Sequence, residues 1–206
     1  MNLLDCLGSR VREEETVEGM QEEGPDHSEE TSYDEHIWLS LKNAIVCTET
    51  VRDALCGLDP DHAAVYEENT EKYIRKLDAL DSAYREAADL AGTGTLLFAD
   101  RFPFRYLTDA YGWKCYAAFS GCTRDTDASP ATLSFLISKV KSENIKTVFY
   151  LENSSQKIAD AVCAATGAHA EMLQSCNNVT RMDYDAGMHY QQLMTENLDA
   201  IEEALK

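Results

Sequence analysis

The chain has 206 residues, 44% of them hydrophobic, which is enough for one large folded domain or two small ones. Its 37 acidic and 18 basic side chains give a net charge of −19. This charge argues against nucleic acid and anionic lipid as partners, because both attract basic surfaces. The negative charge is compatible with cation binding and also with a role in solubility alone. No apolar run is long enough to span a membrane, and the start lacks the features of a signal peptide, so the sequence alone predicts a cytoplasmic chain.

The acidic residues are concentrated near the start. Residues 1–35 hold twelve of them, and Arg10 and Arg12 are the basic ones there. Gly24-Pro25 interrupts any helix in this part. We therefore expect residues 13–35 to form a solvated acidic loop.

Two helices are predicted next. Residues 39–55 have helical periodicity, with Ser40 as the N-cap and Gly57 at the end. A much longer helix is expected over 60–90, starting at Pro60, because its apolar residues recur at helical spacing. The shorter helix places on one side Leu41, Ala44, Ile45, Val51 and Leu55, and the longer one Tyr66, Tyr73, Leu77, Leu80, Tyr84 and Ala87.

Strands and helices alternate after the Gly92-Thr93-Gly94 break. The predicted strands are 95–99, 115–119, 147–151 and 168–173, and the predicted helices are 104–111, 130–143, 155–166 and 187–205. Ser129 and Pro130 are suited to begin one of these helices, and Gly167 to end another. Four such units predict an α/β fold with a parallel sheet covered by helices. The sequence has no GxGxxG, P-loop or GxSxG motif, so nucleotide binding and serine hydrolysis have no support.

Ligands of such a sheet bind at the carboxyl ends of the strands, and two carboxylates stand there. Glu152 directly follows 147–151, and it serves either in a site or as an acidic group facing the amides of the next helix. Asp100 follows 95–99, where an ion pair with Arg101 or Arg105 is the alternative to a functional role.

Two histidines stand among acidic residues. His36 follows Asp34 and Glu35 directly before a helix, and imidazole beside carboxylates favours a divalent cation. His27 lies within the acidic loop, where it adds a weak metal contact or belongs to a solvated spacer. An ordinary exposed loop histidine is the alternative for His36.

The seven cysteines form no CxxC pair, so a four-cysteine zinc site is not expected. Cys122 and Cys176 each follow a predicted strand. Neighbouring strand ends would allow a disulfide between them, and two separate buried thiols are the alternative.

Several segments resemble the solute-binding proteins of zinc and manganese ABC transporters, a group that includes adhesion lipoproteins. DEHIWLSLKNA is similar to the family element DPHxWLSPxNA, in which the histidine binds metal. FYLENSSQKIADAV is similar to an element whose glutamate binds metal in some members. The resemblance further rests on the long helix from DPDHAAVYEENTEKYIRKLDALD, on FADRFPFRYLTDAYG, on SPATLSFLISKVK and on the closing YQQLMTENLDAIEEALK.

The resemblance implies a periplasmic-binding-protein-like metal-binding fold in three parts. These are a remnant of the N-terminal lobe over 1–58, a linking helix over 59–91 and a C-terminal α/β lobe over 92–206. His36 and Glu152 would bind the metal, with Asp100 and His27 as additional contacts. The metal would be zinc, with manganese as the alternative, held between two lobes and delivered to an ABC permease. The full-length protein would then be an extracytoplasmic, periplasmic or cell-surface lipoprotein.

The chain departs from the family pattern at several ligands. Arg101 stands where a family histidine is expected, an earlier histidine has no counterpart, and Met188 falls near the place of a late aspartate. The N-terminal lobe is incomplete, which predicts a fragment or a truncated paralogue. Two rivals stay open: a degenerate lobe acting as an interaction or adhesion surface, and a small α/β enzyme using Glu152 or Asp100 in acid–base chemistry.

Overall fold

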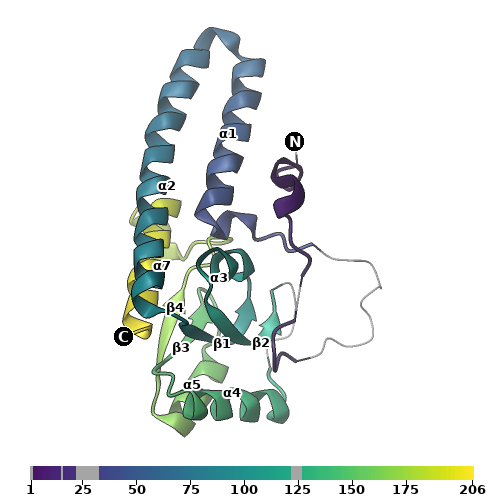
Figure 1. Ribbon diagram of the computed structural model, residues 1–206, viewed down its shortest axis with the longest axis vertical. Helices are drawn as coiled ribbons and strands as arrows, with labels where there is room; N and C mark the ends of the chain where they lie inside the picture. The colour runs from purple at the N-terminus through teal and green to yellow at the C-terminus, as the bar shows by residue number, and fades with distance from the viewer. Residues whose placement is uncertain (1, 15, 22–32, 122–126) are drawn as a thin grey trace.

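The computed structural model describes residues 2–14, 16–21, 33–121 and 127–206. Two long antiparallel helices, α1 (Leu41–Leu58) and α2 (Ala63–Ala91), are joined through a 3-10 turn, η3 (Pro60–His62), and form a hairpin. The base of this hairpin packs on a sheet, while its tip stands clear of the rest of the molecule (Figure 1). No helix of the described part of the chain is long and apolar enough to cross a membrane.

Four parallel strands form one sheet, as the sequence predicts. They are β1 (Thr95–Phe102), β2 (Lys114–Ser120), β3 (Thr147–Leu151) and β4 (His169–Leu173), and their order in the sheet is β2-β1-β3-β4. Because all strands are parallel, their carboxyl ends meet at one edge of the sheet. This is the edge that faces the base of the helix hairpin (Figure 1).

Helices cover both faces of the sheet. The helices that connect the strands are α3 (Arg105–Tyr111), α4 (Pro130–Ser142) and α5 (Lys157–Thr166), and α6 (Arg181–Asp185) and α7 (Tyr190–Ala204) follow the last strand. In β1, Leu96 and Phe98 point to a core shared with α2 and α7, and Leu97 and Ala99 point to a core shared with α4 and α5. This alternation follows from the two-residue period of a strand, and it buries β1 on both faces.

Capping residues mark the helix boundaries that the sequence predicts correctly. The Ser40 hydroxyl accepts a hydrogen bond from the amide of Asn43 at the start of α1, and Ser129 accepts one from Thr132 at the start of α4. Gly167 ends α5 with a left-handed backbone, at φ 83°. Each cap satisfies an amide or a carbonyl that the helix itself leaves unpaired.

Three short helices were not predicted: η1 (Asp5–Arg10), η2 (Ile37–Leu39) and α6. Each is too short for an apolar period to be visible in the sequence. Val51 and Leu55 share the predicted apolar side of α1, yet they are 38% and 39% exposed. Both residues belong to the C-terminal half of α1, the half that extends past the sheet beside α2 (Figure 1).

The predicted acidic loop is paired at its ends and contacts the sheet at Gln21. Glu13 forms an isolated antiparallel bridge with Tyr33, and the amide of Gln21 donates to the Ala118 carbonyl in β2 at 2.9 Å. We expected residues 13–35 to form a solvated loop. The described part of this segment is instead held by contacts at Glu13, Gln21 and Tyr33. Residues 22–32 lie outside the described residues.

Candidate functional site

His36 lies at the entrance to α1, in a buried turn whose polar partner is Asp34. The backbone amide of His36 donates to Asp34 Oδ1 at 2.8 Å, and its ring Nδ1 lies 2.9 Å from the same oxygen. A carboxylate only accepts hydrogen bonds, so Nδ1 is the donor, and the tautomer of the imidazole that this contact favours has its lone pair on Nε2. None of the residues that the structure describes hydrogen-bonds Nε2. This is the arrangement in which a histidine binds a metal through Nε2.

Asp34 is itself fixed by the fold. Its side chain is buried, and its carbonyl accepts a hydrogen bond from the Tyr106 hydroxyl at 3.1 Å. The same hydroxyl accepts from the amide of Arg12 at 2.9 Å. Tyr106 in α3 thus ties the N-terminal segment and the turn before α1 to the sheet domain.

The His36 ring lies against the carboxyl end of β2. A Cβ atom placed on Gly121 would lie 3.3 Å from His36 Cε1 and 3.0 Å from the carbonyl oxygen of Phe102 in β1. Gly121 therefore permits a close approach that a larger residue would obstruct. The segment before α1 consequently covers the sheet edge at which parallel α/β folds bind ligands.

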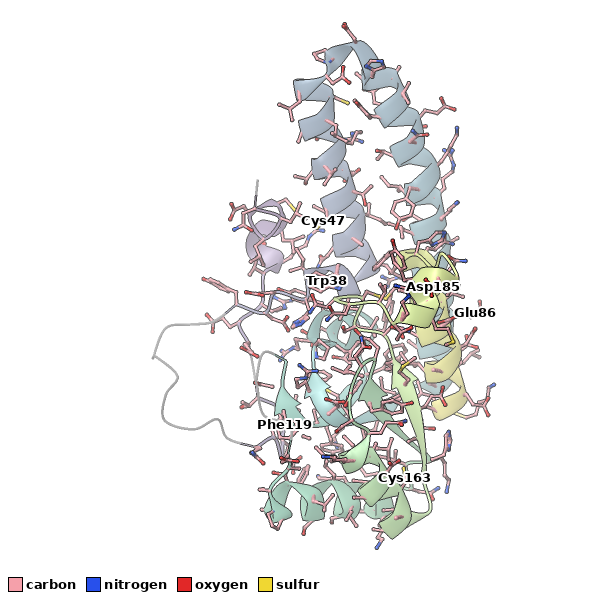
Figure 2. All side chains as sticks on the ribbon, turned by 180° about the vertical axis from the view of Figure 1, so that it is seen from behind. Trp38, Cys47, Glu86, Phe119, Cys163 and Asp185 are labelled. Atoms are coloured by element: carbon pink, nitrogen blue, oxygen red, sulfur yellow. The ribbon has the colours of Figure 1, made fainter. Side chains whose placement is uncertain are left out.

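Trp38 connects this segment to the far side of the same edge. Its indole Nε1 donates to the carbonyl of Ser175, directly after β4, at 2.9 Å. Its own carbonyl accepts from the Tyr190 hydroxyl of α7 at 2.6 Å. The rings of Trp38 and His36 are 5.5 Å apart, and Figure 2 shows Trp38 at the base of α1.

Glu152 is buried at the same edge, after β3, and both of its carboxylate oxygens are engaged. Oε2 accepts from the amide of Ser175 at 2.8 Å, and Oε1 accepts from the Ser175 hydroxyl. Glu152 therefore holds the turn after β4, which in turn receives the Trp38 indole. The carboxylate bonds a neighbouring loop and not the amides of α5, and its role as a metal ligand stays a prediction.

Asp100 has a structural role in the sheet. The register of β1 with β2 shifts between Phe98 and Arg101, so Asp100 sits in a bulge. Its Oδ2 accepts from the amide of Leu151 at 3.2 Å, and its Oδ1 accepts from the amide of Arg101 at 2.8 Å. The carboxylate thereby supplies a hydrogen-bond acceptor to an amide of the neighbouring strand β3.

Arg101 follows Asp100 in β1, at the position where the family resemblance implies a histidine. Its guanidinium lies 3.7 Å from Asp100 Oδ1, at the distance of the expected ion pair. The two residues line a cavity of about 310 Å³ together with Asn153 and Lys157. Among the described residues, the lining of this cavity includes neither His36 nor Glu152.

The remaining predicted site residues are His27, Cys122 and Cys176. His27 and Cys122 lie outside the described residues. Cys176 is a free thiol at the sheet edge, and burial raises its pKa to about 12, with the Glu152 carboxylate as the second cause. The pairing of Cys122 with Cys176 stays a prediction.

Within the described ranges, no group of three or more His, Cys, Asp and Glu side chains lies close enough to hold a metal. The edge nevertheless presents one oriented imidazole in a largely buried setting. A single imidazole and water bind a divalent cation weakly, because a closed zinc site takes about four ligands. His36 and Glu152 both reach this edge, linked through Trp38 and Ser175.

Two residues of this arrangement were missed by the sequence prediction of the site: Trp38 and Tyr106. The sequence contains no signal for contacts between the turn before α1 and the turn after β4, because they are separated by more than half of the chain. The contact between Asp34 and His36, by contrast, can be predicted from the sequence, since a carboxylate two residues before a histidine can reach its Nδ1.

Residues 5–204 match the family model described as zinc-uptake complex component A, periplasmic. The zinc-binding lipoprotein AdcA of Streptococcus pneumoniae serotype 4 is 35% identical over 189 residues, which are 90% of this chain and 37% of that protein. The high-affinity zinc uptake system protein ZnuA of Bacillus subtilis is 32% identical over 172 residues, which are 84% of this chain and 53% of that protein. The chain thus spans roughly a third to a half of these relatives.

The fold is that of a solved relative. The Zn(II)-bound ZnuA-like domain of Streptococcus pneumoniae AdcA superposes with a TM-score of 0.72 at 31% identity. The match covers 93% of this chain and 70% of that domain.

Proposed function

Because the chain belongs to the family of periplasmic zinc-uptake component A proteins, we propose that it is part of the solute-binding subunit of a zinc ABC transporter. The family is one of metal-binding uptake components and not of enzymes. In the proposed function the subunit captures zinc outside the cytoplasmic membrane and hands it to the permease. Zinc is the cargo, and manganese is the alternative.

The observation that carries this proposal is the geometry of His36. Asp34 fixes the ring through Nδ1, and Cε1 of the same ring lies against Gly121 at the sheet edge. A neutral imidazole oriented by a carboxylate is a good zinc ligand, whereas manganese prefers carboxylate and carbonyl oxygens. Glu152 is the second proposed ligand, and its use would require that it share its lone pairs with Ser175.

Titration calorimetry of the chain with zinc tests the proposal. We expect the wild-type chain to bind zinc weakly. In His36→Ala the zinc affinity should fall by a further factor of about ten or more, because the best ligand is lost. The matched control is His62→Ala, since His62 also contacts a carboxylate, that of Asp59, but is exposed at the far tip of the hairpin. Equal zinc affinity in wild type and His36→Ala would contradict the role of His36.

A second candidate function follows from the small number of ligands within reach of one another. A lobe that keeps the fold but binds no metal would act as an interaction or adhesion surface. If this second function is the correct one, titration of the wild-type chain with zinc would give no binding heat. A manganese titration completes the comparison: tighter manganese than zinc binding would reverse the proposed choice of cargo.

A further inference from the structure

Cys6 and Cys47 bring two thiols together at the contact between η1 and α1. Their sulfur atoms are 4.0 Å apart. Cys6 follows the first residue of η1, and Cys47 lies in the second turn of α1, on the side next to η1 (Figure 2). The two residues are separated by 41 positions in the sequence, so the fold and not the local chain brings them together.

The contact around the two sulfurs is a packed interface. Leu7 of η1, Ile37 and Tyr106 form a buried apolar cluster, and the partly buried Cys6 and Cys47 lie at its edge. The Cys6 thiol donates to the carbonyl of Leu3 at 2.9 Å, which limits the directions in which its sulfur points. Both sulfurs are therefore held near each other while their side chains remain partly accessible to a small oxidant.

We propose that Cys6 and Cys47 form a disulfide that clamps the N-terminal segment to α1 when the protein is oxidised. A disulfide needs sulfur atoms about 2.05 Å apart. Rotation about χ1 of one cysteine, with a small shift of η1, closes the remaining gap. The proposal does not depend on metal binding.

The oxidant in this proposal is a small disulfide such as oxidised glutathione. The thiolate of one cysteine attacks a sulfur of the oxidant, forms a mixed disulfide and releases one glutathione thiolate. The second cysteine thiolate then attacks the protein sulfur of that mixed disulfide and releases the other glutathione. Two protons leave the protein, two protein sulfurs are oxidised, and the oxidant is reduced to two thiols.

The Cys47 thiol sets the order of these steps. Burial raises the pKa of Cys47 to about 12, and the neighbouring Cys6 thiol adds to the shift. Cys47 is therefore protonated at neutral pH, and we expect the first attack to come from Cys6. Because only a thiolate attacks, the reaction should become faster as the pH rises.

The disulfide would enclose the segment that carries the proposed metal ligand. Residues 6–47 include the acidic residues 13–35 and both Asp34 and His36. Closing this loop restricts the unfolded chain more than the folded one. The oxidised protein should therefore melt at a temperature higher by several degrees, on the order of 5–10 °C.

Peptide mapping tests the proposal directly. The reduced full chain is incubated with oxidised glutathione, treated with an alkylating agent and digested with trypsin without reduction. The cleavage sites Arg10, Lys42 and Arg52 isolate the two cysteines in peptides MNLLDCLGSR and NAIVCTETVR. We expect these peptides to be recovered joined, with a mass lower by two hydrogen atoms than their sum.

Two variants and one denaturing condition make the result decisive. Cys47→Ser should abolish both the joined peptides and the rise in melting temperature, whereas Cys56→Ser should change neither, because the Cys56 thiol contacts the Ala63 carbonyl instead. The proposal is overturned if, after oxidation of the folded wild type, the peptides of Cys6 and Cys47 are recovered separately in alkylated or glutathionylated form. An equal yield of joined peptides in concentrated urea would also overturn it, since the fold would then not direct the pairing.

Discussion

At the scale of single residues, the proposed metal site depends on the contact between Asp34 and His36. The Asp34 carboxylate fixes the ring position and places the proton on Nδ1. Trp38 and Ser175 then hold the turn against the sheet edge. The sequence places Asp34 and Glu35 beside His36, and the folded turn shows that Asp34 is the carboxylate that bonds the ring.

Replacing Asp34 with Asn should weaken zinc binding about 10- to 100-fold, as loss of an orienting carboxylate does at other metal sites. Asn retains the size of the side chain but not the charge that favours the correct ring tautomer. Asp59→Asn is the matched control, because Asp59 makes the same contact with the exposed His62 at the hairpin tip. Zinc titration calorimetry checks both variants. An Asp34→Asn protein with wild-type affinity would show that Asp34 only supports the fold.

Helices and strands show which features a sequence predicts and which it does not. The four strands and helices α1, α2, α3, α4, α5 and α7 were expected close to their observed limits, because periodicity and the caps Ser40, Ser129 and Gly167 are local properties. The strand order β2-β1-β3-β4 and the bulge at Asp100 depend on pairing between distant segments, which the sequence did not predict. The same is true of Glu152, whose partner Ser175 belongs to another loop.

Glu143 is an example of an element-scale contact that can be tested through pH. It lies at the end of α4 and accepts hydrogen bonds from the Tyr116 hydroxyl, from Lys114 at 3.3 Å and from Thr95 at 3.3 Å. The Tyr116 hydrogen bond, with further help from Lys114, lowers the pKa of Glu143. A lowered folded-state pKa stabilises the fold above the unfolded-state pKa, and this stabilisation is lost as pH falls through the folded-state pKa.

Glu143→Gln should therefore lower the free energy of unfolding at neutral pH by about 1 kcal/mol, a value reduced for the solvent exposure of Glu143. The difference from wild type should shrink in strongly acidic buffer, where the wild-type carboxylate is protonated. Urea unfolding at both pH values measures it, with the exposed Glu202→Gln as control. A destabilisation that is the same at both pH values would exclude the charge as its cause.

At the scale of the whole molecule, two long helices and a sheet domain meet at one edge. The segment before α1 covers the carboxyl ends of the strands, so that His36, Gly121 and Glu152 come from separate parts of the chain to one place. The division into residues 1–58, 59–91 and 92–206 remains a prediction. In the structure, α2 contributes Leu77, Leu80 and Tyr84 to the same core as the sheet.

The most direct test of the central claim observes the His36 ring while zinc is added. In a sample labelled with ¹⁵N in its histidine rings, the His36 signals are assigned by their loss in His36→Ala. We expect zinc to shift the Nε2 resonance of His36 strongly, while Nδ1 keeps the proton that it shares with Asp34. Zinc that binds to the chain while both His36 resonances stay unchanged would contradict the claim that this imidazole holds the metal.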